Sequence, residues 1–120
     1  YVDPTTAKPT FKNYWPGDVD VSNPSAGATA FVYDNPDDLF EVQANGTLVR
    51  ATVGRAVDMG YTAGSTINGR SKEELDTTAG ADLALRVIRI SGDPSNSDIG
   101  SANANWIVKF NEHIYYNYST

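Results

Sequence analysis

The feature that most constrains the fold is an abundance of turn-forming and β-branched residues beside a shortage of leucine. Gly, Pro, Asn, Ser and Thr make up 46 of the 120 residues, and Val occurs ten times against five for Leu. Helical bundles depend on Leu, Ala, Glu and Lys, of which only Ala is plentiful here. β-branched and aromatic residues separated by turn formers are typical of all-β domains. We therefore expect an all-β fold, a small antiparallel β-sandwich or β-barrel with long loops.

The first 29 residues differ from the rest because they hold four of the six prolines: Pro4, Pro9, Pro16 and Pro24. Proline fixes φ and biases the residue before it toward extended geometry. The sequence predicts an extended N-terminal arm over residues 1–29 and a β core domain over residues 30–120. The arm carries Phe11, Tyr14 and Trp15, which a solvated tail would not need. These aromatic side chains either fold back on their own core or lie on another subunit.

The first half of the core domain contains three segments with the pattern of strands. Residues 30–33 are a short apolar run that ends at a turn. Residues 39–44 alternate apolar and polar side chains, as a half-buried strand does. Asn45 and Gly46 form the strongest hairpin signal in the chain, so residues 48–59 are expected to return as the paired strand.

The second half begins with a glycine-rich stretch, residues 60–80, in which residues 71–75 could form one helical turn. Residues 83–90 are apolar on both faces, which is typical of a strand that is central or covered by a partner. Arg86 and Arg89 lie in this strand and are expected on opposite faces, because side chains alternate. A long loop follows over residues 93–103.

The last expected strand, residues 105–112, alternates again. Trp106, Val108 and Phe110 are expected to point inward, and Lys109 and Asn111 outward. The chain ends in a tail that contains Tyr115 and Tyr116. The alternation of Trp106 with Val108 and Phe110 suggests that Trp106 belongs to the core.

No motif predicts catalysis, a cofactor or a metal site. Residues 64–71 match a phosphate-binding loop except for Arg70 in place of Lys, but they lack the preceding strand and the following helix. Residues 18–22 and 93–98 resemble the starts of calcium loops without the glutamate that completes one, and a loose calcium site remains an alternative. The chain has no cysteine, and its single histidine, His113, has no nucleophile motif beside it. We expect a protein that is not an enzyme.

Charge and hydropathy exclude two classes of partner. The net charge of −6 disfavours binding to nucleic acid, which needs basic side chains for the phosphates. The longest apolar run is only a few residues, so no segment is expected to span a membrane, and no signal peptide is visible.

The order of the short motifs resembles a family of small virion structural proteins of tailed phages, including marine ones. The resemblance covers most of residues 10–116, and its motifs lie at residues 13–17, 33–37, 39–43, 53–54, 64–66, 69–71, 74–75, 85–89, 103–106 and 108–113. It implies a capsid decoration, or cement, protein that binds the major capsid protein on the outer capsid surface after assembly in the host cytoplasm. It also implies a homo-oligomer, with a trimer slightly favoured over a dimer.

The candidate contacts to capsid or neighbouring subunits are aromatic and arginine side chains: Phe11, Tyr14, Trp15, Arg86, Arg89, Tyr115 and Tyr116. The alternative function is a carbohydrate-binding or host-surface adhesion module, in which tyrosine and tryptophan rings would stack on sugar faces. An enzyme is the weakest of the three classes.

Overall fold

The computed structural model describes residues 1–3, 6–15 and 28–115 of the chain. Two compact units are present in it. The first unit contains residues 1–33 together with residues 63–72, and the second contains residues 34–62 and 73–120. The predicted arm of residues 1–29 falls within the first unit, which also includes residues 30–33 and a loop from later in the sequence.

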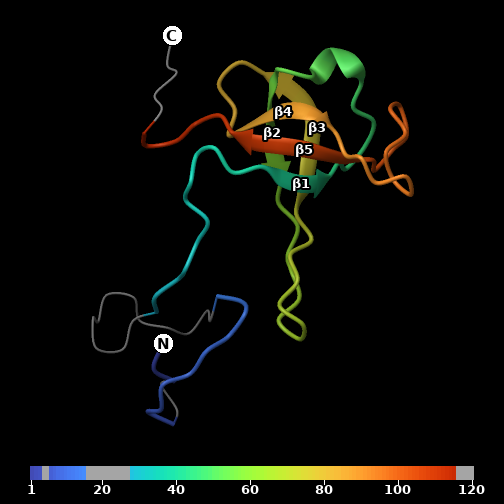
Figure 1. The fold of residues 1–120 in the computed structure, drawn as a ribbon. Helices are drawn as coiled ribbons and strands as arrows, with labels where there is room; N and C mark the ends of the chain where they lie inside the picture. Colours follow the sequence, from blue (N-terminus) through green and yellow to red (C-terminus); the bar gives the residue numbers. More distant parts are fainter. Residues whose placement is uncertain (4–5, 16–27, 116–120) are drawn as a thin grey trace. The chain divides into compact units, whose positions relative to one another are not determined.

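The second unit is built on one five-stranded sheet (Figure 1). Its strands are β1 (Phe40–Gln43), β2 (Ala56–Gly60), β3 (Glu74–Gly80), β4 (Leu85–Ile90) and β5 (Asn105–Phe110). They are ordered β1-β5-β4-β2-β3, and each neighbouring pair is antiparallel. Among the described residues the helical content is one short 3₁₀ turn, Arg50–Thr52. The predicted all-β antiparallel class is confirmed.

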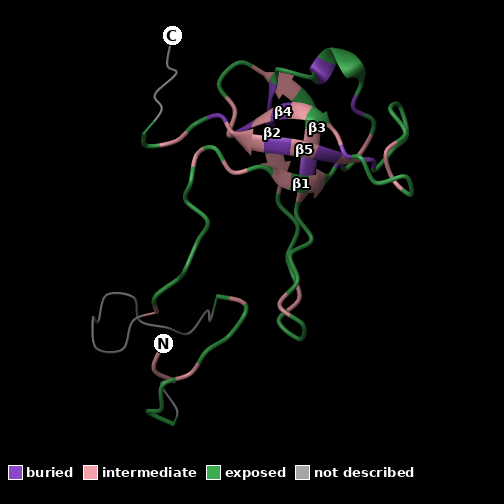
Figure 2. Cartoon of the chain, viewed as in Figure 1, coloured by how far each residue is buried: buried purple, intermediate pink, exposed green. Residues whose placement is uncertain are grey.

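The core side chains of the paired strands lie on one face of this sheet, since Leu85 pairs with Phe110 and Val87 with Val108. In Figure 2 the described buried residues, drawn in purple, all lie in the second unit. Its largest fully buried side chains are Trp106, Leu48, Leu75, Val57, Val87 and Val108. The predicted alternation of β1 and β5 is confirmed here, because Phe40 and Val42 pack against the core while Glu41 is exposed. β4 occupies the middle of the sheet, as its apolar sequence predicts.

A β-bulge in β4 changes the direction of its second arginine. Arg86 pairs with Lys109, and Arg89 pairs with Ile107, with a register shift between Val87 and Arg89. Lys109 and Ile107 are two residues apart in β5 and therefore share a face, so Arg86 and Arg89 share it too. The prediction that they point to opposite faces is wrong, because the bulge inserts one extra residue between them.

The predicted hairpin at Asn45 and Gly46 is also wrong. Gly46 lacks the positive φ that a type I′ turn requires, and β1 pairs with β5 rather than with the residues that follow it. The Asn45 N–H instead donates to the Leu75 carbonyl at 2.9 Å, beside a bridge between Ala44 and Leu75. This contact joins the two edge strands, β1 and β3, at one point.

Two other local predictions fail for related reasons. The helical turn over residues 71–75 is absent because β3 begins at Glu74, where pairing with β2 buries Leu75 completely. The strand over residues 30–33 is absent because these residues have no described strand beside them. A strand needs hydrogen-bonding neighbours, and local sequence cannot supply them.

Asn111 is buried, although alternation predicts it outward. Its Oδ1 atom accepts hydrogen bonds from Nε and Nη2 of Arg86 at 3.0 and 2.8 Å, and its Nδ2 donates to the Leu83 carbonyl at 2.8 Å. Arg86 Nη1 also donates to the Gly54 carbonyl at 3.3 Å. Asn111 therefore links the end of β5 to the turn before β4.

Candidate interaction surface

Residues 1–3 pair with residues 8–10 in the first unit, beside a turn at Thr6 and Ala7. The Asp3 N–H donates to the Lys8 carbonyl at 3.0 Å, and the Thr10 N–H donates to the Tyr1 carbonyl at 2.7 Å. Between these bonds, Val2 and Pro9 form an antiparallel bridge. This turn brings Tyr1 beside the aromatic residues that follow Thr10.

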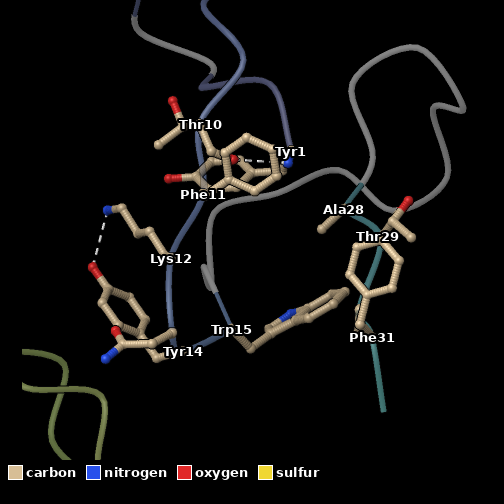
Figure 3. Close-up of a pocket in the computed structure, with 11 residues that line it drawn as sticks. Tyr1, Thr10, Phe11, Lys12, Tyr14, Trp15, Ala28, Thr29 and Phe31 are labelled. Carbon is tan, nitrogen blue, oxygen red and sulfur yellow. Dashed lines mark hydrogen bonds between the residues drawn. The ribbon is translucent and has the colours of Figure 1, made fainter.

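A pocket of 690 Å³ lies next to this turn (Figure 3). The structure brings together the three arm aromatics predicted from sequence, and all of them line it: Phe11, Tyr14 and Trp15. Phe31, which the sequence assigned to a strand, lines the pocket as well, and the indole of Trp15 points toward its ring. The aromatic character of this region is therefore greater than the sequence predicted.

Lys12 is a cationic side chain that lines the pocket. Its Nζ atom donates a hydrogen bond to the Tyr14 hydroxyl at 2.9 Å and lies 5.1 Å from the centre of the same ring (Figure 3). The hydrogen bond to Tyr14 raises the pKa of Lys12 above its ordinary value. A cation over an aromatic face is favourable, so this pair orients the Tyr14 ring.

The loop of residues 63–72 completes the first unit and is closed by its own backbone. The Ser65 N–H donates to the Arg70 carbonyl at 2.9 Å, and the Gly69 N–H donates to the Ser65 carbonyl at 2.8 Å. Asn13 Nδ2 donates to the Asn68 carbonyl at 2.9 Å, which ties the arm to this loop. No helix follows the loop, because β3 does, so the geometry of a phosphate-binding loop is not formed.

Gly69 makes the contact between arm and loop sterically possible. Its φ is +65°, and a Cβ atom there would overlap the side chain of Asn13. We expect Gly69→Ala to release residues 6–15 from the loop, measured as at least about tenfold faster amide exchange in those residues, because the arm then loses its anchor. The matched control is Gly54→Ala, since Gly54 also has a positive φ, +84°, but open space around it. Equal exchange in both variants would contradict this role.

The first unit exposes an unusual amount of apolar side chain. Phe11 is 92% exposed, Phe31 is 93% exposed, and Ile67, at the turn of the loop, is 97% exposed. Trp15, Val32 and Tyr33 are exposed too. We call these six residues the arm surface. Large contiguous apolar patches are rare on soluble monomers and mark sites of interaction, and the gathering of exposed apolar side chains in one small unit favours such a site here.

The remaining predicted contacts lie in the second unit and have different environments. Arg86 is partly buried and satisfied by Asn111, which makes it a structural residue. Arg89 is exposed and donates to the Ile90 carbonyl at 3.2 Å. Tyr115 is 72% exposed. Tyr116 lies outside the described residues.

A row of rings missed by the sequence analysis leads to Tyr115. The ring centres of Phe40 and Phe110 are 5.2 Å apart, those of Phe110 and His113 are 5.9 Å apart, and those of His113 and Tyr115 are 5.0 Å apart. His113 Nδ1 accepts the Tyr115 N–H at 3.1 Å, so in the neutral ring Nε2 carries the proton and donates to Asp34 at 2.9 Å. His113 thus acts as a link between segments.

The residues of the calcium-like motif at 93–98 form a turn. Asp93 Oδ1 accepts hydrogen bonds from the backbone N–H and the hydroxyl of Ser95, at 2.9 and 2.8 Å, and these bonds lower the pKa of Asp93. Within the part of the chain that the structure describes, no group of three or more His, Cys, Asp or Glu side chains could hold a metal ion. Residues 18–22, the other such motif, lie outside that part.

The same described ranges contain no helix that is long and apolar enough to cross a membrane. Comparison of the chain with protein-family models, with curated protein sequences and with solved structures found no match. The functional argument therefore depends on the chain's own residues.

Proposed function

We propose that this protein is a capsid decoration protein that binds the major capsid protein on the outer surface of a virion and associates with copies of itself. The observation that carries the proposal is the arm surface, where Phe11, Phe31 and Ile67 are almost fully exposed. The family resemblance in the sequence supports the same assignment. Adhesion to neighbouring polypeptides gives these side chains a partner that the isolated chain lacks.

The energetics of the arm surface suit a cement protein. Burying apolar surface contributes about 25 cal/mol per Å², and the six side chains of the arm surface are large. Ordering of flexible segments and loss of rigid-body freedom offset part of that gain. The offset is smaller here because the hydrogen bond from Asn13 to Asn68 and the closed loop of residues 63–72 already restrict these described residues. Because a capsid offers many symmetric sites, a modest favourable free energy at each site would sum to a large stabilisation of the capsid.

The test is binding to capsids that lack this protein. We expect the triple variant Phe11→Ser, Trp15→Ser and Phe31→Ser to lose at least about a hundredfold in affinity, because central aromatic side chains dominate protein interfaces. The matched control is Tyr61→Ser, which changes an exposed aromatic residue of the second unit. Equal occupancy of capsids by the triple variant and the wild-type protein would overturn the proposal.

The pocket favours one alternative, a carbohydrate-binding or host-surface adhesion module. Tyr14, Trp15 and Phe31 offer ring faces, and Lys12 and Asn13 offer hydrogen-bond donors beside them. A glycan array distinguishes the two functions. Selective binding of a glycan that is lost in Trp15→Ser would favour the alternative, whereas capsid binding without any glycan signal supports decoration.

A further inference from the structure

The pocket of the first unit carries hydrogen-bond donors beside its aromatic rings (Figure 3). Lys12 Nζ donates to the Tyr14 hydroxyl at 2.9 Å, and a second hydrogen bond, with the side chain of Tyr1, also raises the pKa of Lys12. All three residues line the pocket and belong to the first unit. We call Tyr1, Lys12 and Tyr14 the donor cluster.

The donor cluster has donors left for an incoming group. An ammonium has three N–H donors and no acceptor, and a phenol has one O–H donor together with an acceptor oxygen. Lys12 uses one N–H on each phenol oxygen, so it keeps a third, and each phenol keeps its own O–H. The cluster is therefore suited to a group that only accepts hydrogen bonds.

Charge favours an anionic group in the same place. Among the described residues that line the pocket, Lys12 is charged, and none is Asp or Glu. A negatively charged acceptor makes charge-assisted hydrogen bonds to an ammonium, which are shorter and stronger than neutral ones. One ammonium between two phenols matches the single charge and the two oxygen atoms of a carboxylate. Phosphate, by contrast, is usually held by clusters of arginine.

The rings give the pocket room for an apolar group next to that carboxylate. Phe11 and Phe31 are almost fully exposed, and the indole of Trp15 points toward the Phe31 ring (Figure 3). The volume of 690 Å³ lies within the range of about 300–1,000 Å³ that is typical of ligand pockets, and it is far larger than a carboxylate alone. The occupant is therefore expected to join a carboxylate to an apolar side chain.

The surroundings of the pocket favour a polypeptide over an acidic sugar. The arm surface also contains Val32 and Ile67, two exposed aliphatic side chains. Asn13 lines the pocket, and its hydrogen bond to the Asn68 carbonyl links the pocket to the loop that carries Ile67. Sugars stack on aromatic ring faces, which aliphatic side chains do not offer. The apolar side chains of a polypeptide pack against aromatic and aliphatic residues alike.

We propose that the pocket binds an Asp or Glu side chain of a partner polypeptide, with an adjacent apolar side chain packed against the aromatic rings. The donor cluster binds the carboxylate, and Phe11, Trp15 and Phe31 contact the apolar neighbour. Pockets that receive such anchor side chains dominate the binding energy of protein interfaces. The inference rests on the proposed function, and it names the chemistry of the capsid protein segment that the arm surface contacts.

Two capped tripeptide amides, Leu-Glu-Leu and Leu-Gln-Leu, test the inference on the full chain. Titration followed by the amide NMR signals of residues 10–15 should show the Glu peptide binding about fivefold more tightly, the gain expected from an exposed ion pair. Lys12→Met should remove that difference, and Lys12→Arg should retain it. Lys8→Met is the matched control, since Lys8 is exposed in the same unit and does not line the pocket.

Three results of this titration would overturn the inference: equal affinity for the two peptides, no binding of either, or a preference for the Glu peptide that survives in Lys12→Met. Glucuronate serves as the acidic-sugar probe. Tighter binding of glucuronate than of the Glu peptide would also overturn the inference, in favour of the carbohydrate alternative.

Binding to capsids that lack this protein distinguishes this inference from the proposed function. We expect Lys12→Met to lower capsid affinity about fivefold and Lys8→Met to leave it within about twofold of the wild-type value. Full capsid affinity in Lys12→Met, together with a loss in the triple serine variant, would overturn the carboxylate site and leave the decoration proposal intact. Absence of capsid binding by the wild-type protein would overturn decoration even where the peptide preference is observed.

Discussion

Trp106→Ala is expected to lower the free energy of unfolding by about 3–5 kcal/mol, the usual cost of removing a large buried aromatic side chain. Trp106 is fully buried, and it is the largest member of a small core. Small domains have a total stability of about 5–15 kcal/mol, so the variant is expected to be largely unfolded at mild urea concentrations. Urea titration followed by circular dichroism measures the loss without relying on tryptophan fluorescence.

The matched variant is Trp106→Phe. The Trp106 Nε1 atom is buried without a hydrogen-bond partner, and such a donor costs about 1–3 kcal/mol. Phenylalanine removes that donor and keeps most of the ring, so its net cost is expected to be well below that of alanine. Equal losses for the two variants, or a loss below about 1 kcal/mol for alanine, would contradict the assignment of Trp106 as the centre of the core.

Asn111→Ala is expected to have the second largest effect, a loss of about 2–3 kcal/mol, because it leaves buried groups without partners. The Leu83 carbonyl loses its donor, and Arg86 loses the acceptor of two hydrogen bonds. Asn111→Asp is the comparison variant, since it keeps an acceptor for Arg86 but sets a carboxylate oxygen against the Leu83 carbonyl in place of the donor. In the same urea titration both variants should be destabilised, and a cost for alanine within about 0.5 kcal/mol of zero would refute the structural role of this link.

The strands that sequence predicted best are those whose burial can be inferred from alternation alone. β1 and β5 alternate apolar and polar residues, and β4 is expected to carry apolar residues on both faces, so their positions and the central place of β4 followed from the pattern. β3 could not be predicted this way, because Leu75 is buried by pairing with β2 rather than by a local pattern. Bulges are equally invisible, and one of them reversed the direction expected for Arg89.

Some residues of the candidate site could be predicted from sequence, but the contacts that bring distant residues together could not. The aromatic residues at positions 11, 14 and 15 stand out in a proline-rich segment, and the structure places them together. Phe31 was missed because a short apolar run has the same local pattern whether or not a neighbouring strand exists. The bond from Asn13 to Asn68 joins residues 55 positions apart, and nothing in either local sequence indicates it.

The most direct test of the central claim, adhesion to a capsid, is to count copies of this chain in purified virions produced from the genome that encodes it. Quantitative mass spectrometry of intact particles should find the chain in a fixed ratio to the major capsid protein, and mild dissociation should release it while the capsid stays closed. Particles that contain no copies, or that hold them only in the tail fraction, would contradict the account.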